Sequence, residues 1–387
     1  MILKDKYYGQ SARIARWKID NPIENLLARL ADYSEICKSL YVFYYRLSDR
    51  KYFNHGIKLI DRQLAIHKDQ FVKVKHNRLV RDMVYCLHRF GISFEEYCIY
   101  YFVQRNTYSR SQFVSDKLRH YYCDLVNGKD IPNILNDKYN CYLHYRDFFK
   151  REVLGCYSYD DLAKFRDFVQ RHPKFILKPT GGNCGHGVQI LSVSTENSAD
   201  DLFNVSISKG SFVVEELIKQ GDGMDSLHPQ SINSVRVSTF VLNNTVNIIA
   251  AVLRMGKGDS VVDNAGSGGM YASIDVQNGI VQTDARTYSD IHYNFHPDTG
   301  VPIIGFQLPH WNEALSLIEQ MALKQKGTTL IAWDIAYSAV GGGSWIMVEG
   351  NAVGSWDVLQ SNRQIGLKPY LHSLLDEYFQ YGKKSSQ

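Results

Sequence analysis

The spacing of apolar and polar residues changes about a third of the way along the chain. Up to residue 127, apolar and aromatic positions recur at helical spacing, as in ADYSEICKSLYVFYYRL and EEYCIYYFVQR, with few glycines or prolines. Aromatic residues at this spacing are expected to pack helices together rather than to stack on a sugar. They include Tyr33, Tyr41, Tyr44 and Tyr45. The pattern predicts a helical N-terminal region over residues 1–127.

Asparagine, glycine and proline gather in the segment VNGKDIP, which is the best candidate for a domain boundary. The segment NDKYNCYLHYRDFFKREVL, residues 136–154, is expected to form one more helix. Residues 128–170 are therefore interpreted as a linker helix and the segment that leads into the next unit.

Strands are predicted beyond residue 171, where β-branched runs such as KFILKP, VQILSV and FVVEELI alternate with glycines. Three antiparallel hairpins are expected, over residues 236–255, 271–286 and 329–353. The second has Asn278 and Gly279 at its centre, a dipeptide favoured in type I′ turns. Residues 311–325 have helical periodicity. The pattern predicts an α+β arrangement, with a small lid-like subdomain over residues 171–220 and a larger one over residues 221–387 that ends in a helix.

Composition narrows the possible partners and location. The 387 residues are 44% hydrophobic and 22% charged, as in ordinary globular chains, and a net charge of +4 gives no sign of a nucleic-acid partner. The start MILKDKYYGQ does not resemble a signal peptide, and no apolar run approaches the roughly 20 residues that span a bilayer. A cytoplasmic protein without a transmembrane segment is expected. The seven cysteines form no CxxC pair, so free thiols are expected.

A glycine-rich segment follows the first predicted strand. KFILKP ends in Lys178 and leads directly into TGGNCGHGV. Its glycines let backbone amides approach an anion without obstruction by side chains. They are Gly181, Gly182, Gly185 and Gly187. The segment is not a Walker loop, because no GKS or GKT closes it, and alone it is also compatible with a glycine turn beside a surface lysine.

A second group of polar residues lies in the last predicted hairpin. Asp334 lies in IAWDIAY, and Glu349 and Asn351 lie in IMVEGN. Side chains two apart on a strand share a face, so Glu349 and Asn351 can reach one site, and Asp334 on the partner strand can join them. Three oxygen donors among apolar neighbours are costly unless a cation or hydrogen-bond donors compensate them. The arrangement predicts a magnesium site that bridges nucleotide phosphates.

With these segments the chain resembles the ATP-grasp superfamily, most closely its branch associated with sugar transfer and cell-surface polysaccharide synthesis. The matching segments are FILKPTGGNCGHG, FVVEELIKQ, SINSVRVSTF, VDNAGSGGMYASID, AWDIAY and MVEGN, within about residues 136–356. Their order is more specific than any one of them, and GISFEEYCIYYF in the helical region is also similar to that branch. The resemblance implies an α+β ATP-grasp fold, in which two α+β subdomains enclose ATP.

The resemblance also implies roles for the nucleotide-binding residues. Lys178 would contact the α- and β-phosphates, Lys138 would be the second nucleotide lysine, and the glycine loop would cover the phosphates. His186 in that loop would hydrogen-bond phosphate or solvent, with a phosphorylated intermediate as the alternative. The interdomain hinge would read the adenine edge with backbone groups and bind ribose with a carboxylate; the alternative is a plain strand end. The hinge residues are Glu215, Glu216, Leu217 and Ile218.

In the same resemblance, the oxygen donors of the last hairpin would hold one or two Mg²⁺ ions between the β- and γ-phosphates. Arg236 and Arg254, on adjacent strands of one hairpin, would stabilise the transferred phosphoryl group or hold an anionic acceptor, because a guanidinium fits both; ordinary surface arginines are the alternative. Many members place an arginine two residues before the metal aspartate, where this chain has Ala332. Either Arg236 or Arg254 takes that role, or the acceptor chemistry differs. Further candidate substrate residues are Asn233, Asp263 and Asn264.

The function implied is an ATP- and Mg²⁺-dependent ligase that phosphorylates a carboxylate to an acyl phosphate, which an amine then attacks to give an amide. One substrate would be a sugar acid of a surface polysaccharide and the other an amino compound. Two alternatives stay open. One is a phosphotransferase that acts on a hydroxyl, and the other is an ATP-binding regulatory protein without turnover. The sequence does not predict an oligomeric state.

Overall fold

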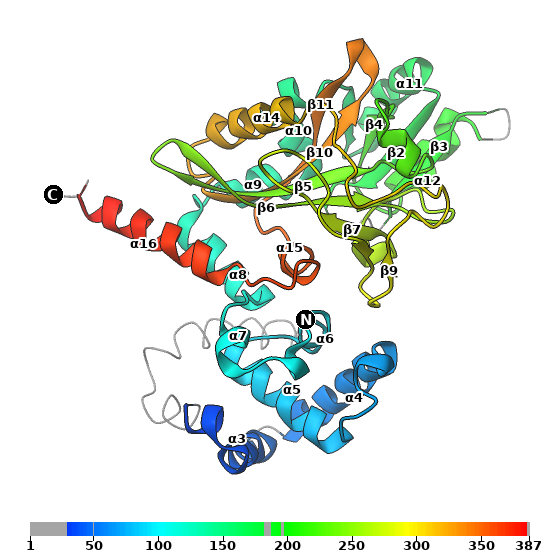
Figure 1. Cartoon of the computed structure of the whole chain (residues 1–387). Helices are drawn as coiled ribbons and strands as arrows, with labels where there is room; N and C mark the ends of the chain where they lie inside the picture. The colour runs from blue at the N-terminus through cyan, green and yellow to red at the C-terminus, as the bar shows by residue number, and fades with distance from the viewer. Residues whose placement is uncertain (1–28, 49, 182–186, 195–196, 385–387) are drawn as a thin grey trace. The chain divides into compact units, whose positions relative to one another are not determined.

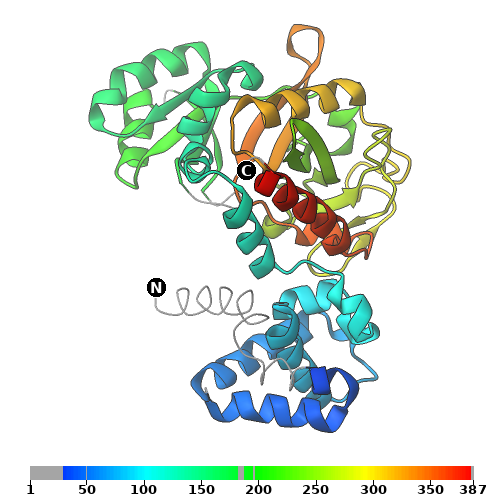
Figure 2. The same cartoon turned by 90° about the vertical axis from the view of Figure 1, so that its left-hand side faces the viewer.

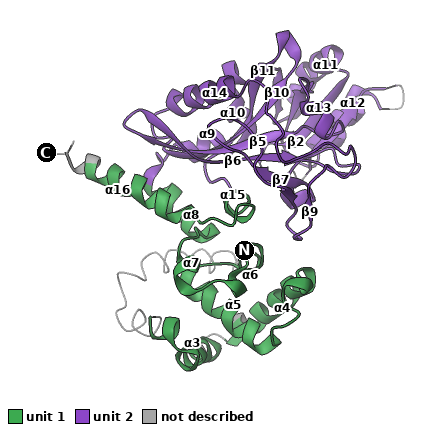
Figure 3. Cartoon of the chain, viewed as in Figure 1, with its two compact units in different colours: residues 1–125, 355–387 green, residues 126–354 purple. Residues whose placement is uncertain are grey.

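The computed structural model describes residues 29–48, 50–181, 187–194 and 197–384 (Figure 1). Two compact units divide the chain (Figure 3). Unit 1 comprises residues 1–125 and 355–387, and unit 2 comprises residues 126–354. The last 33 or so residues group with the helical unit, whereas the sequence assigned them to the large subdomain. In the described ranges, no helix is both long and apolar enough to cross a membrane.

Unit 1 is helical, as its periodicity predicts. Its helices are α3 (Glu35–Ser48), α4 (Arg50–Ile66), α5 (His76–Phe90), α6 (Phe94–Ile99), α7 (Thr107–Ser111), α8 (Asp116–Val126), α15 (Asp357–Ser361) and α16 (Lys368–Lys384), with short 3-10 turns at Lys68–Gln70 and Phe102–Gln104. Local sequence sets the ends: α5 stops at Gly91, which has a left-handed φ of 73°, and α6 begins with a capping box made by Ser93 and Glu96.

Only some of the tyrosine side chains that the sequence predicts in the core of the first helices are buried. Tyr41 packs in the core at 5% exposure, as expected, and the Tyr45 ring stacks on the His88 ring with centroids 3.6 Å apart. Tyr33 and Tyr44 are 91% and 52% exposed, so the expectation that they form core is wrong. Helical spacing alone does not reveal which tyrosines are exposed.

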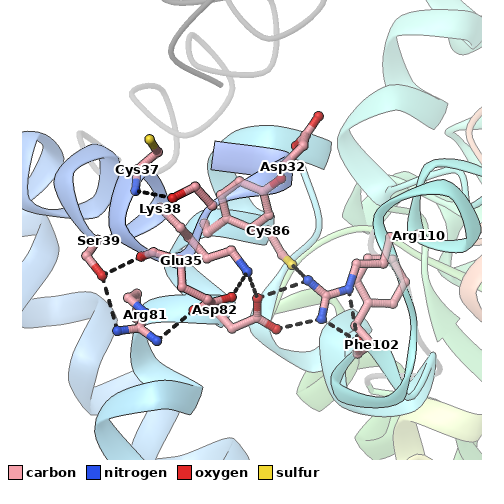
Figure 4. A network of polar contacts seen from close by, with 12 residues as sticks. Asp32, Glu35, Cys37, Lys38, Ser39, Arg81, Asp82, Cys86, Phe102 and Arg110 are labelled. Atoms are coloured by element: carbon pink, nitrogen blue, oxygen red, sulfur yellow. Dashed lines mark hydrogen bonds and ion pairs between the residues drawn. The ribbon is translucent and has the colours of Figure 1, made fainter. Parts of the chain in front are cut away.

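A buried ion-pair network joins several helices of unit 1 (Figure 4). The Asp82 carboxylate on α5 accepts hydrogen bonds from Arg110 at 2.9 and 2.6 Å, from Lys38 at 3.2 Å and from the Tyr97 hydroxyl at 2.6 Å. Burial raises the pKa of Asp82, but the hydrogen bond and charge of Arg110 outweigh burial and leave the pKa lowered. The network therefore stabilises helix packing with an ionised carboxylate.

The two stretches of chain that form unit 1 are joined by specific polar contacts. The Gln360 side chain accepts from the Val114 N–H at 2.9 Å and donates to the Val114 carbonyl at 2.8 Å. The Gln364 amide oxygen accepts from Arg105 at 2.7 Å. Because Gln360 is fully buried, these contacts fix the segment around residues 360–364 to helices that precede it by more than 200 positions.

Unit 2 contains a four-stranded antiparallel sheet, in the order β1-β4-β2-β3. Its strands are β1 (Val153–Cys156), β2 (Lys174–Pro179), β3 (Gln189–Ser192) and β4 (Phe212–Glu216), and it packs with α11 (Leu162–Arg171), α12 (Ala199–Ile207) and a 3-10 turn at Tyr159–Asp161. The helix expected over residues 136–154 is wrong at its end. α10 (Lys138–Phe149) stops at Lys150, which has a φ of 45°, and Val153 and Leu154 pair with β4 instead.

The second sheet of unit 2 has seven strands, in the order β11-β10-β5-β6-β7-β8-β9. Figure 2 shows its orange strands, within residues 330–351, beside the gold helix of residues 311–324. They are β5 (Ser234–Leu242), β6 (Thr245–Met255), β7 (Met270–Ser273), β8 (Ala285–Arg286), β9 (His292–Tyr293), β10 (Leu330–Ser338) and β11 (Ser344–Asn351). α14 (Trp311–Lys324) packs on β5, β6, β10 and β11, and α10 packs on β11. The remaining elements are α9 (Ile131–Leu135), α13 (Met224–Leu227), and 3-10 turns at Ala265–Ser267 and Val340–Gly342.

The three predicted hairpins differ in how closely they match. β5 and β6 turn at Asn243 and Asn244, whose φ values of 51° and 60° fit a type I′ turn. β10 and β11 also pair as expected. The type I′ turn predicted at Asn278 and Gly279 is wrong, because only Gly279 has a positive φ and its N–H donates to the Asp275 carbonyl, which makes a wider turn.

Candidate active site

A row of charged residues crosses one face of the seven-stranded sheet in unit 2. Asp334 on β10 lies opposite Glu349 on β11 and opposite Arg236 on β5, while Ser234 lies opposite Arg254 on β6. Paired residues share a face, and so do residues two apart on one strand. The register therefore directs these side chains to the same side, as the sequence predicts for the two arginines and the two carboxylates.

Asp334 lies at the centre of this row and is completely buried. Its two carboxylate oxygens accept from Nε and Nη2 of Arg236, both at 2.8 Å, and Nη2 of Arg254 lies 3.0 Å from Oδ2. Burial alone raises the pKa of Asp334, but the charges of Arg236 and Arg254 outweigh it and hold the pKa well below its usual range. Asp334 is therefore ionised and anchors both guanidinium groups.

The pKa of Glu349 is shifted in the opposite direction from that of Asp334. Burial and the neighbouring Asp334 charge raise its pKa, and the charges of Lys178, Arg236 and Lys138 only partly offset this. The Asn351 amide lies 3.5 Å from the Glu349 carboxylate, so the two side chains expected on one face do lie together. A carboxylate forced beside another carboxylate favours either a proton or a cation between them.

A β-bulge sets the direction of Glu349. Asp334 pairs with Glu349, but the next residue, Ile335, pairs with Met347, so Val348 has no partner in β10. Because Asp334 and Ile335 lie on opposite faces of β10, Glu349 and Met347 also face opposite sides although they are two residues apart. Met347 and Ile335 pack in the main core, and Glu349 is turned to the row of charges.

Lys178 reaches the site from the end of β2. Its amino group lies 2.8 Å from Oε1 of Glu215 on β4, and Arg151 lies 2.7 Å from Oε2 of the same carboxylate. Glu215 is buried, which raises its pKa, but the charges of Lys178 and Arg151 lower the pKa to about 2. In the structure Glu215 therefore holds the predicted phosphate lysine in place. Its assignment as a ribose ligand stays a prediction.

Glu215→Gln should reduce the acid sensitivity of the fold. The folded pKa of about 2 is below the ordinary 4.5, so the ionised Glu215 stabilises the fold above pH 4.5, and this contribution is lost as the pH falls toward 2. The difference corresponds to roughly 3 kcal/mol. Urea unfolding of wild-type and variant at several pH values below 5 measures it. Equal slopes of unfolding free energy against pH would contradict the ion pair.

The predicted hinge begins in the last residues of β4 and continues past the end of the strand. Glu216 pairs through its backbone N–H with the Glu152 carbonyl at 3.0 Å, and its carboxylate accepts from the Glu152 N–H at 3.2 Å. Leu217 and Ile218 follow outside β4 and are half-buried. The reading of an adenine edge by their backbone groups stays a prediction.

The remaining predicted nucleotide residues are only partly described. Lys138 is the first residue of α10, behind the capping residue Asp137, and its N–H donates to the Thr180 carbonyl at 3.1 Å, beside the start of the glycine segment. Gly181 is exposed, and Gly187 has a φ of 77° that suits glycine. The other predicted loop residues, Gly182, Gly185 and His186, lie outside the described residues.

The candidate substrate residues take different places. Asp263 joins the row: its Oδ2 accepts from the Ser234 N–H at 2.9 Å and from the Ser234 hydroxyl, and Arg254 lies 3.8 Å away. Asn264 caps a short turn by accepting from the Gly266 N–H at 2.8 Å. Asn233 is fully buried, and its amide donates to loop acceptors that include the Met224 and His228 carbonyls. Asn233 thus supports the loop before β5.

The donor set at Asp334, Glu349 and Asn351 fits a hard divalent cation whose coordination nucleotide phosphates would complete. Among the described residues, no group of three or more histidine, cysteine, aspartate and glutamate side chains forms a metal site. The set of Asp334, Glu349 and Asn351 contains only two such side chains, because its third member is an amide. All six described cysteines are free thiols, as the sequence predicts, and five of them are buried.

Two residues of the site were not predicted. Ser234 accepts from Nε and Nη2 of Arg254 at 3.0 and 2.7 Å and so fixes that guanidinium. Arg151, between α10 and β1, contacts both sheets of unit 2. In the sequence it lies within FFKREVL, where a run of charges is typical of a solvated surface. No pattern in the sequence distinguishes it from the exposed arginines.

A sequence model described as sugar-transfer associated ATP-grasp matches residues 98–375, more than half of the chain. The chain belongs to this family. The predicted family and the α+β ATP-grasp fold are thereby confirmed. No curated protein sequence matches the chain.

Three solved structures that match this ATP-grasp protein are distant from it in sequence. The ATP-grasp ligase PsnB complexed with minimal precursor has 13% sequence identity, covers 68% of each chain and gives a TM-score of 0.41. D-alanyl-alanine synthetase A from Vibrio cholerae has 10% identity, covers 65% of this chain and 67% of its own, and gives 0.44. N5-carboxyaminoimidazole synthetase from Staphylococcus aureus complexed with ADP has 9% identity, covers 66% and 59%, and gives 0.40.

Proposed function

We propose that unit 2 binds ATP with Mg²⁺ and activates a carboxylate as an acyl phosphate, which an amine then converts to an amide. The observation that carries this proposal is the row in which Glu349 and Asp334 face each other between Lys178 on one side and Arg236 and Arg254 on the other. Anionic phosphates and an anionic acceptor both need such cations, and a bound Mg²⁺ would neutralise phosphate charge beside the two carboxylates.

The residues of this chain then have separate tasks. Lys178, held by Glu215, binds the nucleotide phosphates, and Lys138 adds a second positive charge near Glu349. Arg236 and Arg254 stay oriented because Asp334 binds both, so they stabilise negative charge on the transferred phosphoryl group without reorganising. An oriented pair of guanidinium groups also fits a carboxylate acceptor. The pair supports a ligase over a phosphotransferase, since a neutral hydroxyl needs two guanidinium groups less.

The substrates are proposed by analogy with the family description. A sugar acid of a surface polysaccharide would supply the carboxylate, and an amino compound would supply the nucleophile. A phosphotransferase that acts on a hydroxyl is the second candidate, supported by the same Lys178 and carboxylate set. A cytoplasmic location, where ATP is abundant, belongs to the same proposal.

Hydroxylamine trapping tests the proposal directly. With ATP, Mg²⁺ and a pool of uronic acids and other sugar acids, hydroxylamine is expected to yield a hydroxamate by attack on the acyl phosphate, together with ADP. Mass spectrometry of the products identifies the acid that reacted. A stable phosphate ester without hydroxamate would favour the phosphotransferase. Binding of ATP with no ADP release from any pool would favour a regulatory protein.

A further inference from the structure

Arg151 makes contacts with both parts of the proposed nucleotide site at once. Nε and Nη2 lie 3.2 and 2.7 Å from Oε2 of Glu215 on β4. Nη1 donates to the Met347 carbonyl at 2.6 Å, and Nη2 lies 3.4 Å from the Val348 carbonyl, both on β11. The Arg151 side chain is only 4% exposed, so it interacts with these protein groups rather than with solvent. One guanidinium thus connects the small sheet to the edge strand of the large sheet.

The two carbonyls that Arg151 binds belong to the β-bulge. Met347 is the last residue paired before the bulge, and Val348 is the residue without a partner in β10. A bulge disrupts the ladder locally, so its buried carbonyl groups need another donor. Arg151 supplies that donor immediately before Glu349. The bulge in turn determines that Glu349 faces Asp334 rather than the core.

Through Glu215, Arg151 also affects the position of Lys178. Glu215 bonds Lys178 through Oε1 and Arg151 through Oε2, so each oxygen serves one cation. When phosphate draws the Lys178 amino group away, Glu215 remains paired because Arg151 does not leave. Without Arg151, the buried carboxylate would depend on Lys178 alone and would compete with phosphate for it.

We propose that Arg151 is a positioning residue that couples the two halves of the nucleotide site, because it holds Glu215 for Lys178 and the Val348 bulge for Glu349. This inference rests on the proposed function, since it assigns Arg151 to the same ATP and Mg²⁺ site. A lysine at this position keeps one positive charge but lacks the planar fork that reaches Glu215 and the β11 carbonyls together.

The test uses calorimetric titration of the full chain with a non-hydrolysable ATP analogue, with and without Mg²⁺. Without Mg²⁺, Arg151→Lys is expected to bind the analogue with nearly the affinity of wild-type protein. Adding Mg²⁺ should raise the affinity of the variant by roughly 10-fold to 100-fold less than it raises that of wild-type protein, a loss typical of residues that orient metal ligands. Arg151→Met should weaken binding under both conditions. Arg171→Met is the matched control, because Arg171, the last residue of α11, pairs with Glu152 at the exposed surface of unit 2 and should change neither value.

The outcomes separate this inference from the proposed function. If wild-type protein does not bind the analogue, the proposed function fails. If wild-type protein binds with a gain from Mg²⁺ and a folded Arg151→Lys shows the same gain, the coupling role of Arg151 is wrong. Circular dichroism and urea midpoints of each variant show whether it is folded, and Arg151→Lys decides the question even if Arg151→Met does not fold.

Discussion

Glu349→Gln should lower kcat by about 10²- to 10³-fold while the protein stays folded, a loss typical of removing one charge that stabilises a transition state. The amide has nearly the shape of the carboxylate but cannot bind a hard cation with the same charge. Stability should change little, because burial and Asp334 already disfavour the charged form of Glu349 and raise its pKa. ADP release and urea unfolding measure the two effects separately.

Glu313→Gln serves as the control for that experiment, since Glu313 is an exposed acidic residue in the first turn of α14. It should leave both activity and stability unchanged. Full activity of Glu349→Gln, or undiminished wild-type activity in excess chelator, would remove Glu349 from the site and with it the assignment of Mg²⁺.

Asp334→Asn is expected to reduce both activity and stability, with a loss of about 3–5 kcal/mol in the free energy of unfolding. Asp334 is completely buried and is the carboxylate that Arg236 and Arg254 share. An asparagine leaves the buried Arg236 without this counter-ion and leaves Arg254 with only the Asp263 carboxylate, 3.8 Å away. Chemical denaturation measures the loss of stability, and ADP release at a temperature where the variant is folded measures the loss of activity.

Asp147→Asn is a suitable comparison, because Asp147 is 85% exposed and only pairs with Lys324 at 3.4 Å. Exposed pairs contribute between about 0 and 1 kcal/mol, so this variant should unfold almost as wild-type does. A fully stable Asp334→Asn would mean that the two arginines find other partners. The role of Asp334 as their shared counter-ion would then be wrong.

The sequence predicted the elements whose patterns are local. Alternating β-branched runs around Asn243 and Asn244 predicted the β5–β6 hairpin, and the periodicity of residues 311–325 predicted α14. The spacing of Glu349 and Asn351 and the motif around Asp334 placed these three residues together, because strand geometry determines which side chains share a face.

Features that depend on distant parts of the chain could not be predicted in this way. Val153 and Leu154 continue the pattern of α10, but pairing with β4 makes them a strand. The β11 bulge adds one residue to an otherwise regular alternation, and nothing around Val348 marks it. Arg151 and Ser234 become part of the site only because folding brings Glu215, β11 and Arg254 to them.

The discontinuity of unit 1 has a consequence for how the chain folds. Unit 2 is continuous from residue 126 to residue 354, whereas unit 1 needs residues 355–387 to complete it. During synthesis unit 2 can therefore finish folding while the Val114 backbone and Arg105 still await Gln360 and Gln364. Until α15 and α16 leave the ribosome, the surface that they bury on the earlier helices stays open. Helices α3 to α8 thus wait longer for their packing partners than unit 2 does, although they are synthesised before it.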